Sequence, residues 1–268
     1  MDSLYWKHLF IRTPVEGVAK KLQHGLAFWR VVLHPGIREV YFEGGRLDRA
    51  MERLVTPASN CVDVGAHLGS TLSLLVKLAP RGRHMAFEPV ARKAAWLRKK
   101  FPEVDVREVA LGNTSGKVTF SENLSRPGFS GLRAPTDVND RVREVEVQAG
   151  CLDDLLPPDY RVDFLKVDVE GAELKVFQGA VRTLNRDRPA ILFESGPGGA
   201  EKFGLSRRDL FSYLADEQGY GIYMVKDYLS GGGPIDFERF DAAHRYPFGA
   251  FNYLALARGH KPAGTVGR

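Results

Sequence analysis

Four acidic residues stand where apolar runs of the sequence end. Asp63 and Asp168 each follow a short apolar segment and precede a glycine turn, and Glu88 and Glu194 close two further apolar runs. If these runs are parallel strands, their carboxyl ends meet at one edge of a sheet, where open α/β folds bind ligands. A carboxylate beside the first glycine turn repels a pyrophosphate and attracts positive charge. The pattern therefore favours S-adenosylmethionine, with its ammonium and sulfonium groups, over NAD.

The first glycine turn has the spacing G-x-x-x-G, from Gly65 to Gly69, and not the dinucleotide spacing G-x-G-x-x-G. Such a turn also occurs without a ligand, as a tight connection between a strand and a helix. Glu88 adds context, because a carboxylate at the end of the second strand can accept two hydrogen bonds from ribose hydroxyls. Residues 109–113 are small and apolar at the end of the expected third strand, which suits a flat adenine ring.

Asp168 and Glu194 are expected at the tips of neighbouring strands. Two carboxylates placed in this way could hold Mg²⁺, which prefers oxygen ligands. Equally, one of them could act as a general base while the other orients it. The sequence leaves both roles open. Glu170 and Glu173, three residues apart, would share one helix face, and the helix dipole alone explains acids there.

The spacing of apolar residues predicts strands that alternate with helices, which implies a parallel sheet with right-handed crossovers. The expected strands lie near 60–64, 83–88, 104–109, 162–167, 189–194, 219–225 and 251–256, and the expected helices near 69–79, 90–100 and 172–184. The main domain is expected over residues 56–258.

The flanking segments and one internal segment carry separate predictions. Residues 1–55 are predicted to form a helical cap, with Thr13 as a helix N-cap and Pro14 in the first turn. This basic, amphipathic segment could associate weakly with a membrane surface, but packing on its own domain is the simpler interpretation. Two alternating stretches flank residues 123–142, a loop that is either a lid over the site or disordered. Residues 259–268 are predicted to be a flexible tail.

Composition places few further limits on function. The 268 residues carry a net charge of +5, with 44% hydrophobic and 26% charged residues, which is ordinary for a globular protein. No apolar run is long enough to span a membrane, and the first residues do not resemble a signal peptide. Cys61 and Cys151 match neither disulfide nor metal-site spacing. They are therefore expected to be reduced, which suits a cytoplasmic protein.

Several stretches together resemble the FkbM family of S-adenosylmethionine-dependent methyltransferases. The matching stretches are Asp63-Val64-Gly65-Ala66 with Gly69, Phe87-Glu88-Pro89, Ala110-Leu111-Gly112, Leu152-Asp153-Asp154 and residues 164–173. The resemblance covers roughly residues 56–196, and its last stretch is the most distinctive. It implies a single Rossmann-like class I methyltransferase domain with a mostly parallel seven-stranded sheet and an antiparallel C-terminal strand. It also implies O-methylation of a hydroxyl on a sugar, a glycan or a secondary metabolite.

One residue departs from the family pattern. This chain has His67 where the family usually has Asn after Gly-Ala, near the expected methionine end of the cofactor. His67 could be a tolerated contact to the cofactor or a base whose pKa suits neutral pH. The predicted cofactor-binding residues are Asp63, Gly65, Ala66, His67, Gly69, Glu88, Pro89, Ala110, Leu111 and Asp168. The candidate catalytic residues are Asp168, Glu194 and His67, and Asp168 and Glu194 are the candidate Mg²⁺ ligands.

Three rival functions remain at the level of sequence. An RNA methyltransferase is suggested by the basic residues of the helix near 90–100, but a solvated helix face explains these residues more simply. A non-catalytic binding module is disfavoured by the intact strand-end acids, and an NAD-dependent oxidoreductase by Asp63 and the glycine spacing. The expected partner is therefore a small-molecule or carbohydrate acceptor and not a nucleic acid. The oligomeric state stays open.

Overall fold

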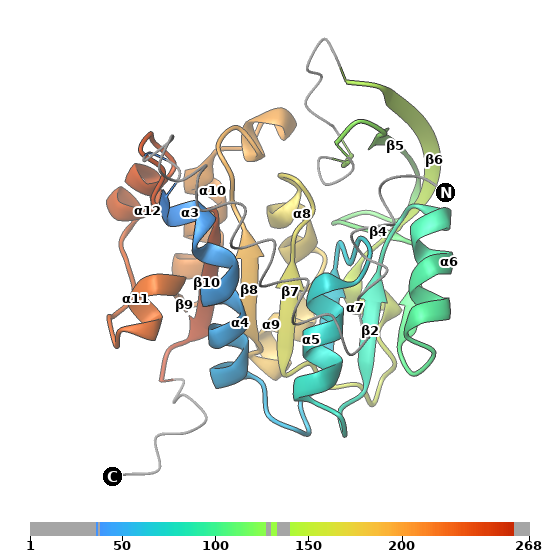
Figure 1. Ribbon diagram of the computed structural model, residues 1–268, viewed down its shortest axis with the longest axis horizontal. Helices are drawn as coiled ribbons and strands as arrows, with labels where there is room; N and C mark the ends of the chain where they lie inside the picture. The colour runs from blue at the N-terminus through green and yellow to red at the C-terminus, as the bar shows by residue number, and fades with distance from the viewer. Residues whose placement is uncertain (1–35, 37, 127–129, 133–139, 260–268) are drawn as a thin grey trace.

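A seven-stranded sheet forms the centre of the protein (Figure 1). The computed structural model describes residues 36, 38–126, 130–132 and 140–259. The strands follow the order β3-β2-β1-β7-β8-β10-β9 across the sheet. They are β1 (Cys61–Val64), β2 (His84–Phe87), β3 (Asp105–Arg107), β7 (Phe164–Val167), β8 (Ala190–Glu194), β9 (Tyr220–Met224) and β10 (Asn252–Ala257).

The pairing directions confirm the predicted sheet. Strands β3, β2, β1, β7 and β8 pair in parallel, whereas β10 runs antiparallel to both of its neighbours, β8 and β9. All four residues of β1, β2 and β7 are buried. Parallel strands covered on both faces read as nearly continuous apolar runs, which is why the sequence located them well.

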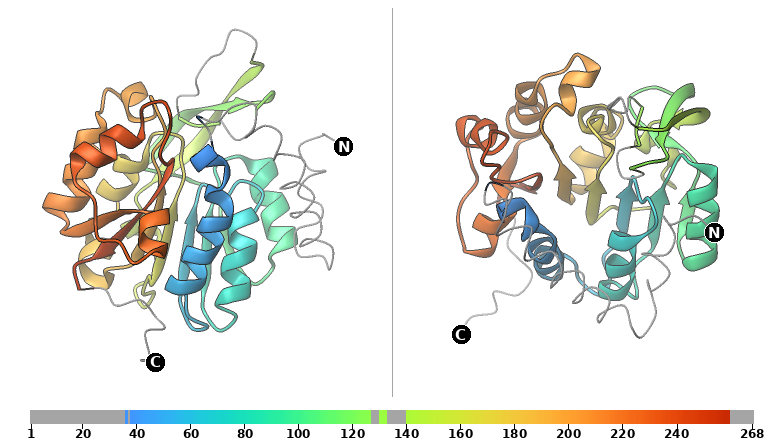
Figure 2. Two further views of the ribbon diagram at one scale, coloured as in Figure 1. Left: turned by 60° about the vertical axis from the view of Figure 1, so that its left-hand side comes forward. Right: turned by 45° about the horizontal axis from the view of Figure 1, so that its top comes forward.

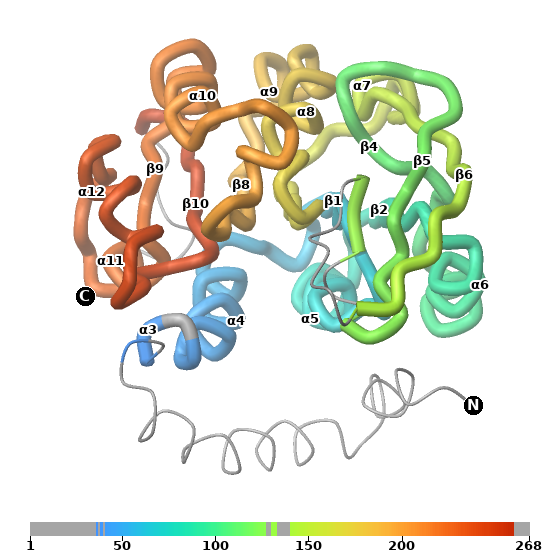
Figure 3. The backbone as a smooth tube through the Cα atoms, turned by 90° about the horizontal axis from the view of Figure 1, so that it is seen from above, coloured from blue at the N-terminus to red at the C-terminus, as the bar shows by residue number. Residues whose placement is uncertain are grey.

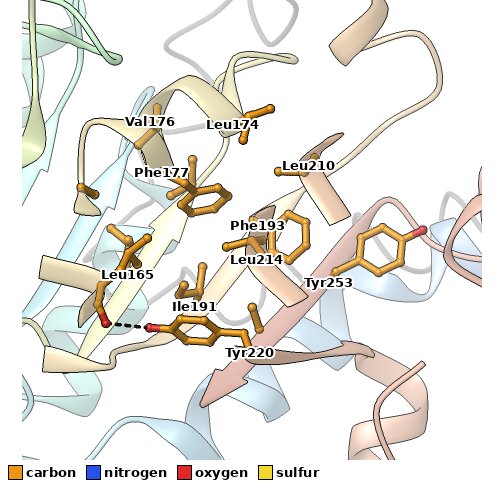
Figure 4. Close-up of a cluster of buried hydrophobic side chains, with 14 of the residues drawn as sticks. Leu165, Leu174, Val176, Phe177, Ile191, Phe193, Leu210, Leu214, Tyr220 and Tyr253 are labelled. Carbon is orange, nitrogen blue, oxygen red and sulfur yellow. Dashed lines mark hydrogen bonds between the residues drawn. The ribbon is translucent and has the colours of Figure 1, made fainter. Parts of the chain in front are cut away.

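Helices cover both faces of this sheet (Figures 1 and 2). They are α3 (Arg38–Tyr41), α4 (Glu43–Leu54), α5 (Ser70–Leu78), α6 (Ala91–Lys100), α7 (Leu152–Leu155), α8 (Glu173–Gln178), α9 (Val181–Asp187), α10 (Arg207–Ser212), α11 (Val225–Leu229) and α12 (Phe237–Ala243). A 3-10 helix (Ala200–Phe203) and a π-helical turn (Tyr213–Glu217) lie between β8 and β9. On one face α8, α9 and α10 pack on alternate strand residues such as Leu165, Ile191 and Phe193 (Figure 4). On the other face α4 and α5 pack on Phe164 and Leu192.

The helix predicted over 172–184 is in fact two helices, α8 and α9, separated at Gly179. The backbone there approaches a neighbouring loop, so that a Cβ atom on Gly179 would lie 1.9 Å from the carbonyl oxygen of Gly112. The carbonyl of Gly179 also accepts a hydrogen bond from the amide of Asp153. Apolar periodicity continues through both helices, so the break is set by tertiary contacts and not by the local pattern.

A second, three-stranded sheet is inserted between β3 and β7. It contains β4 (Ala110–Leu111), β5 (Gly116–Asn123) and β6 (Val142–Gly150) in the order β4-β6-β5, and we call it the insert. Its two long strands contain the alternating stretches of the sequence and pair in antiparallel fashion. The pair Ala110–Leu111, expected to close the third strand of the main sheet, instead pairs with the end of β6. The insert lies at the edge where the parallel strands end (Figure 3).

The structure describes only part of the two terminal segments for which predictions were made. The helix expected after Thr13 and nearly all of the tail over 259–268 lie outside the described residues. Within the described part, α4 buries Ala50, Met51 and Leu54 against the sheet. The domain boundaries at 55 and 258 stay predictions. In the part of the chain that the structure describes, no helix has the length and apolar character needed to cross a bilayer.

Candidate functional site

A cavity of about 240 Å³ opens at the carboxyl edge of the main sheet. It is bounded by the turn after β1, the ends of β2 and β7, and the insert, including its strand β4. The predicted residues that line it are Gly65, Ala66, His67, Glu88, Pro89, Ala110, Leu111 and Asp168. Asp63, Gly69 and Glu194 lie nearby but do not line the cavity. Their binding or catalytic roles, like those of the lining residues, stay predictions.

The glycine turn brings β1 close to β7. Gly65 has φ +74°, and a Cβ atom there would lie 1.8 Å from the carbonyl oxygen of Asp168. Gly69 begins α5 with φ +87°, and its Cβ atom would lie 2.5 Å from the ring of Phe101. Both positions require glycine, because other residues rarely adopt this backbone and would collide with their neighbours. Gly69 therefore has a packing role in the turn.

Glu88 is 3% exposed at the end of β2 and holds the turn in place. Its two carboxylate oxygens accept hydrogen bonds from the amides of His67 and Val90, each at 3.0 Å. Each oxygen has a further lone pair for a ligand. Burial raises the pKa of Glu88, and the ammonium of Lys93 opposes this effect.

Lys93 differs from the expected solvated helix face. It is 2% exposed and lines the cavity from α6. Burial lowers its pKa, while the charges of Glu88 and Glu122 act in the opposite direction. A lysine buried beside carboxylates compensates their charge. No sequence pattern distinguishes Lys93, since it sits among four other basic residues of the same helix.

Lys166 is the principal polar residue that the sequence analysis missed. It lies opposite Asp63 in the pairing of β7 with β1, and its Nζ is 3.1 Å from Oδ1 of Asp63. The same Nζ is 3.4 Å from Oδ2 of Asp168 and donates a hydrogen bond of 2.8 Å to the carbonyl of Gly65. A lysine within an apolar strand, two residues before an acid, was the available signal.

Lys166 and Glu194 determine the ionisation of Asp168. Burial alone would raise the pKa of Asp168, but the ammonium of Lys166 and a hydrogen bond from Glu194 lower it. Burial and the charge of Asp168 raise the pKa of Glu194 well above its usual value. Asp168 is thus the ionised member of the pair, and Glu194 carries the proton that they share.

Glu170 extends the acidic group into the cavity. One carboxylate oxygen from each of Asp168, Glu170 and Glu194 lies within 4.8 Å of the others. Burial, followed by the charge of Asp168, raises the pKa of Glu170 to about 8. Glu173, which accepts hydrogen bonds from the amides of Val169 and Gly171, has a pKa raised by burial to about 7. Burial and the nearby charge of Asp168 therefore favour the protonated forms of Glu170 and Glu173 near neutral pH.

This donor set does not favour the Mg²⁺ ion considered from the sequence. Three carboxyl groups are suitable ligands by type. However, the ammonium of Lys166 contacts Asp168, and the carboxyl group of Glu194 donates a hydrogen bond to the same carboxylate. A cation would have to displace both interactions. No step of the chemistry is therefore assigned to a metal.

Comparison with known proteins gives a match to one methyltransferase family and to several curated proteins. The family model described as the methyltransferase FkbM domain matches residues 63–222. The AMB antimetabolite synthetase AmbE of Pseudomonas aeruginosa is 27% identical over 219 residues, which are 67% of this chain and 10% of that protein. The 2-O-methyltransferase NoeI of Sinorhizobium fredii is 25% identical over 156 residues, which are 50% of this chain and 63% of that protein.

One solved structure among the matches is also that of an FkbM methyltransferase. The crystal structure of a methyltransferase FkbM from Methylobacillus flagellatus aligns with a TM-score of 0.47 at 16% identity, over 75% of this chain and 44% of that one. Of the two curated relatives, the chain spans only 10% of the length of the synthetase and 63% of the length of NoeI.

Proposed function

Since the chain belongs to the FkbM methyltransferase domain family, we propose that it transfers a methyl group from S-adenosylmethionine to a hydroxyl oxygen of a small-molecule or carbohydrate acceptor. The family and the seven-stranded sheet agree with the predicted Rossmann-like class I methyltransferase fold. The name of NoeI, a 2-O-methyltransferase, supports oxygen as the methylated atom.

The observation that carries the proposal is the division of charge and polarity along the cavity. Glu88, at the end of β2, offers a buried carboxylate to the ribose hydroxyls. Asp168, at the end of β7, offers negative charge to the ammonium and the sulfonium, and Glu170 beside it adds to that charge when it releases its proton. The two strands are separated by β1 alone, so their ends are about 10 Å apart, two strand spacings. This separation suits a nucleoside at one end and an amino acid at the other.

The residues of the site have distinct tasks in this proposal. When bound, S-adenosylmethionine supplies a methyl group on a positively charged sulfur. The turn after β1, fixed by Gly65 and Glu88, supports the middle of the ligand. Lys166 fixes the carboxylate of Asp168, which orients the ammonium or takes the proton of the acceptor hydroxyl. Alignment of the acceptor with the methyl group accounts for much of the catalysis in an in-line displacement.

Calorimetric titration with S-adenosylhomocysteine, the demethylated product, tests the cofactor assignment. We expect micromolar binding by the wild type and a loss of at least tenfold in Glu88→Gln, because the amide cannot accept two hydrogen bonds from the ribose in the same way. Glu144→Gln, an exposed glutamate on β6, is the matched control and should bind as the wild type. A folded wild type that does not bind would favour the binding-module alternative.

Substitution of Asp168 separates its two assigned tasks. If Asp168→Asn weakens binding of S-adenosylhomocysteine, the carboxylate orients the ammonium. If binding is retained and turnover of hydroxylated acceptors falls, the carboxylate takes the proton. Near-wild-type binding and turnover in both Asp168→Asn and Glu194→Gln would contradict the role assignment. The acceptor screen should include reactions with and without Mg²⁺, and we expect no requirement for the ion.

A further inference from the structure

One wall of the cavity comes from the insert and not from the main sheet. Phe120 of β5 lines the cavity, as do Ser130 and Leu132 from the segment that follows β5. None of these residues carries charge, and none was among the candidates from the sequence. Phe120 is 7% exposed. Through Phe120 and Leu132 the insert therefore contributes an apolar surface to the cavity.

Packing places this apolar wall at the Glu88 end of the cavity. Phe120 belongs to a buried cluster with Val90 and Ala110, and Leu132 packs against the same cluster. The amide of Val90 donates a hydrogen bond to Glu88. The acids of β7 lie two strands away from β2. Phe120 is therefore next to the expected ribose position and distant from the group that would receive the methionine end.

The wall is held in a fixed position relative to α6. Glu122, two residues after Phe120, is buried and forms an ion pair of 3.0 Å with Arg92 of α6. Its other carboxylate oxygen pairs with Arg143 of the adjacent strand β6, at 2.5 Å. A buried carboxylate held by two arginines fixes the orientation of its strand. The same helix carries Lys93 into the cavity, so α6 and the insert form one continuous boundary.

We propose that Phe120 and Leu132 form the surface against which the adenine ring of the cofactor packs. This inference rests on the proposed function, because it needs a nucleoside whose ribose lies at Glu88. An aromatic ring and a branched aliphatic side chain suit a flat heteroaromatic ligand, since stacking and apolar burial both favour it. The insert then completes the cofactor site, and Ala110, which was predicted to contact adenine, belongs to the same buried cluster as Phe120.

Two probes locate the contact on the ligand. S-adenosylhomocysteine contains adenosine and the amino acid, whereas 5′-methylthioadenosine contains the adenosine half without the amino acid. We expect Phe120→Ala and Leu132→Ala each to weaken the binding of both probes by the same factor, roughly tenfold for Phe120. Thr119→Ala, an exposed neighbour whose side chain points to the other side of β5, is the matched control and should bind both as the wild type. Melting temperatures show whether each variant is folded.

Each other outcome overturns the inference. Wild-type affinity in both folded variants would mean that the insert does not contact the cofactor. Weaker binding of S-adenosylhomocysteine with unchanged binding of 5′-methylthioadenosine would place Phe120 at the amino acid end. If Phe120→Ala does not fold, Leu132→Ala and Phe120→Leu decide the matter by the same comparison. Failure of the wild type to bind S-adenosylhomocysteine would instead reject the proposed function, and this inference with it.

Discussion

Asp63 and Lys166 face each other across the pairing of β1 and β7, and their side chains form an ion pair of 3.1 Å in the interior. Asp63 is fully buried and Lys166 is 7% exposed. Burial raises the pKa of Asp63, whereas the charges of Asp63 and Asp168 raise the pKa of Lys166 against the opposite effect of its own burial. Lys166 lines the cavity and Asp63 does not, so Lys166 connects the buried Asp63 to Asp168 at the cavity.

Removing one partner of this pair should be more costly than removing both. Lys166→Met leaves Asp63 buried without its ammonium, so we expect a loss of about 3–5 kcal/mol in the free energy of unfolding. The double variant Lys166→Met with Asp63→Asn should recover part of that loss, because position 63 then carries no unpaired buried charge, while Asp168 still lacks its contact with Lys166. Urea denaturation of the two single variants and the double variant measures the coupling. Additive losses would show that the two side chains do not interact.

The carboxyl groups at the end of β7 predict a pH dependence of stability. The pKa of Glu170 is raised in the folded protein to about 8, above its ordinary value of 4.5. The folded state thus binds the proton more tightly than the unfolded state, and this contribution to stability is complete below pH 4.5 and is lost as the pH rises towards 8. Between pH 5 and pH 8 the free energy of unfolding should decrease less in Glu170→Gln than in the wild type. Urea denaturation at several pH values measures this difference. The control Glu144→Gln should keep the wild-type slope.

Binding of the positively charged cofactor should release protons. Glu170 and Glu194 both have raised pKa values, so a sulfonium and an ammonium nearby would favour their ionised forms. Calorimetry of S-adenosylmethionine binding at pH 7, in buffers of different ionisation enthalpy, measures the number of protons released. We expect net release in the wild type and less release in Glu170→Gln. An apparent enthalpy that is the same in all buffers would contradict the placement of positive charge beside these acids.

The glycine turn offers a sharp test of backbone geometry. Gly65→Ala would place a Cβ atom 1.8 Å from the carbonyl of Asp168 at φ +74°, so we expect loss of S-adenosylhomocysteine binding and a marked decrease in melting temperature. Gly45→Ala is the control, because this helical glycine of α4 has no atom within 4 Å of a Cβ position. That change should increase stability by about 0.5–1 kcal/mol. Equal melting temperatures in the two variants would contradict the description of the turn.

Much of the main sheet could be predicted because its strands are short, apolar and separated by helices. The antiparallel position of β10 followed from the resemblance and not from periodicity. The break between α8 and α9 could not be predicted, since it depends on the contact of Gly179 with Gly112, nearly seventy residues earlier in the chain. Ala110–Leu111 belong to the insert and not to the third strand of the main sheet, because they pair with the end of β6, which is distant in the sequence.

The prediction of the candidate site succeeded best for acidic residues that stand at the ends of strands. Glu88 and Asp168 end strands and line the cavity, as expected from their positions. Asp63 also ends an apolar run, yet it pairs with Lys166 and does not itself line the cavity, because a strand alternates its side chains between two faces. Lys93 and Phe120 were missed because burial of a lysine among other basic residues, and of a phenylalanine in an insert, depends on tertiary packing.

The pairing of β4 with the end of β6 has a consequence for how this domain can vary. Leu111 and Gly150 are partners in that pairing, so the chain leaves the core and returns to it at neighbouring points. The intervening segment can therefore change in length or be exchanged without shifting the register of β1, β2 and β7. A homologous insert transplanted at these two points would bring its own surface to the cavity while the strands beneath stayed intact. The architecture thus separates the part of the protein that is free to diversify from the part that must stay constant.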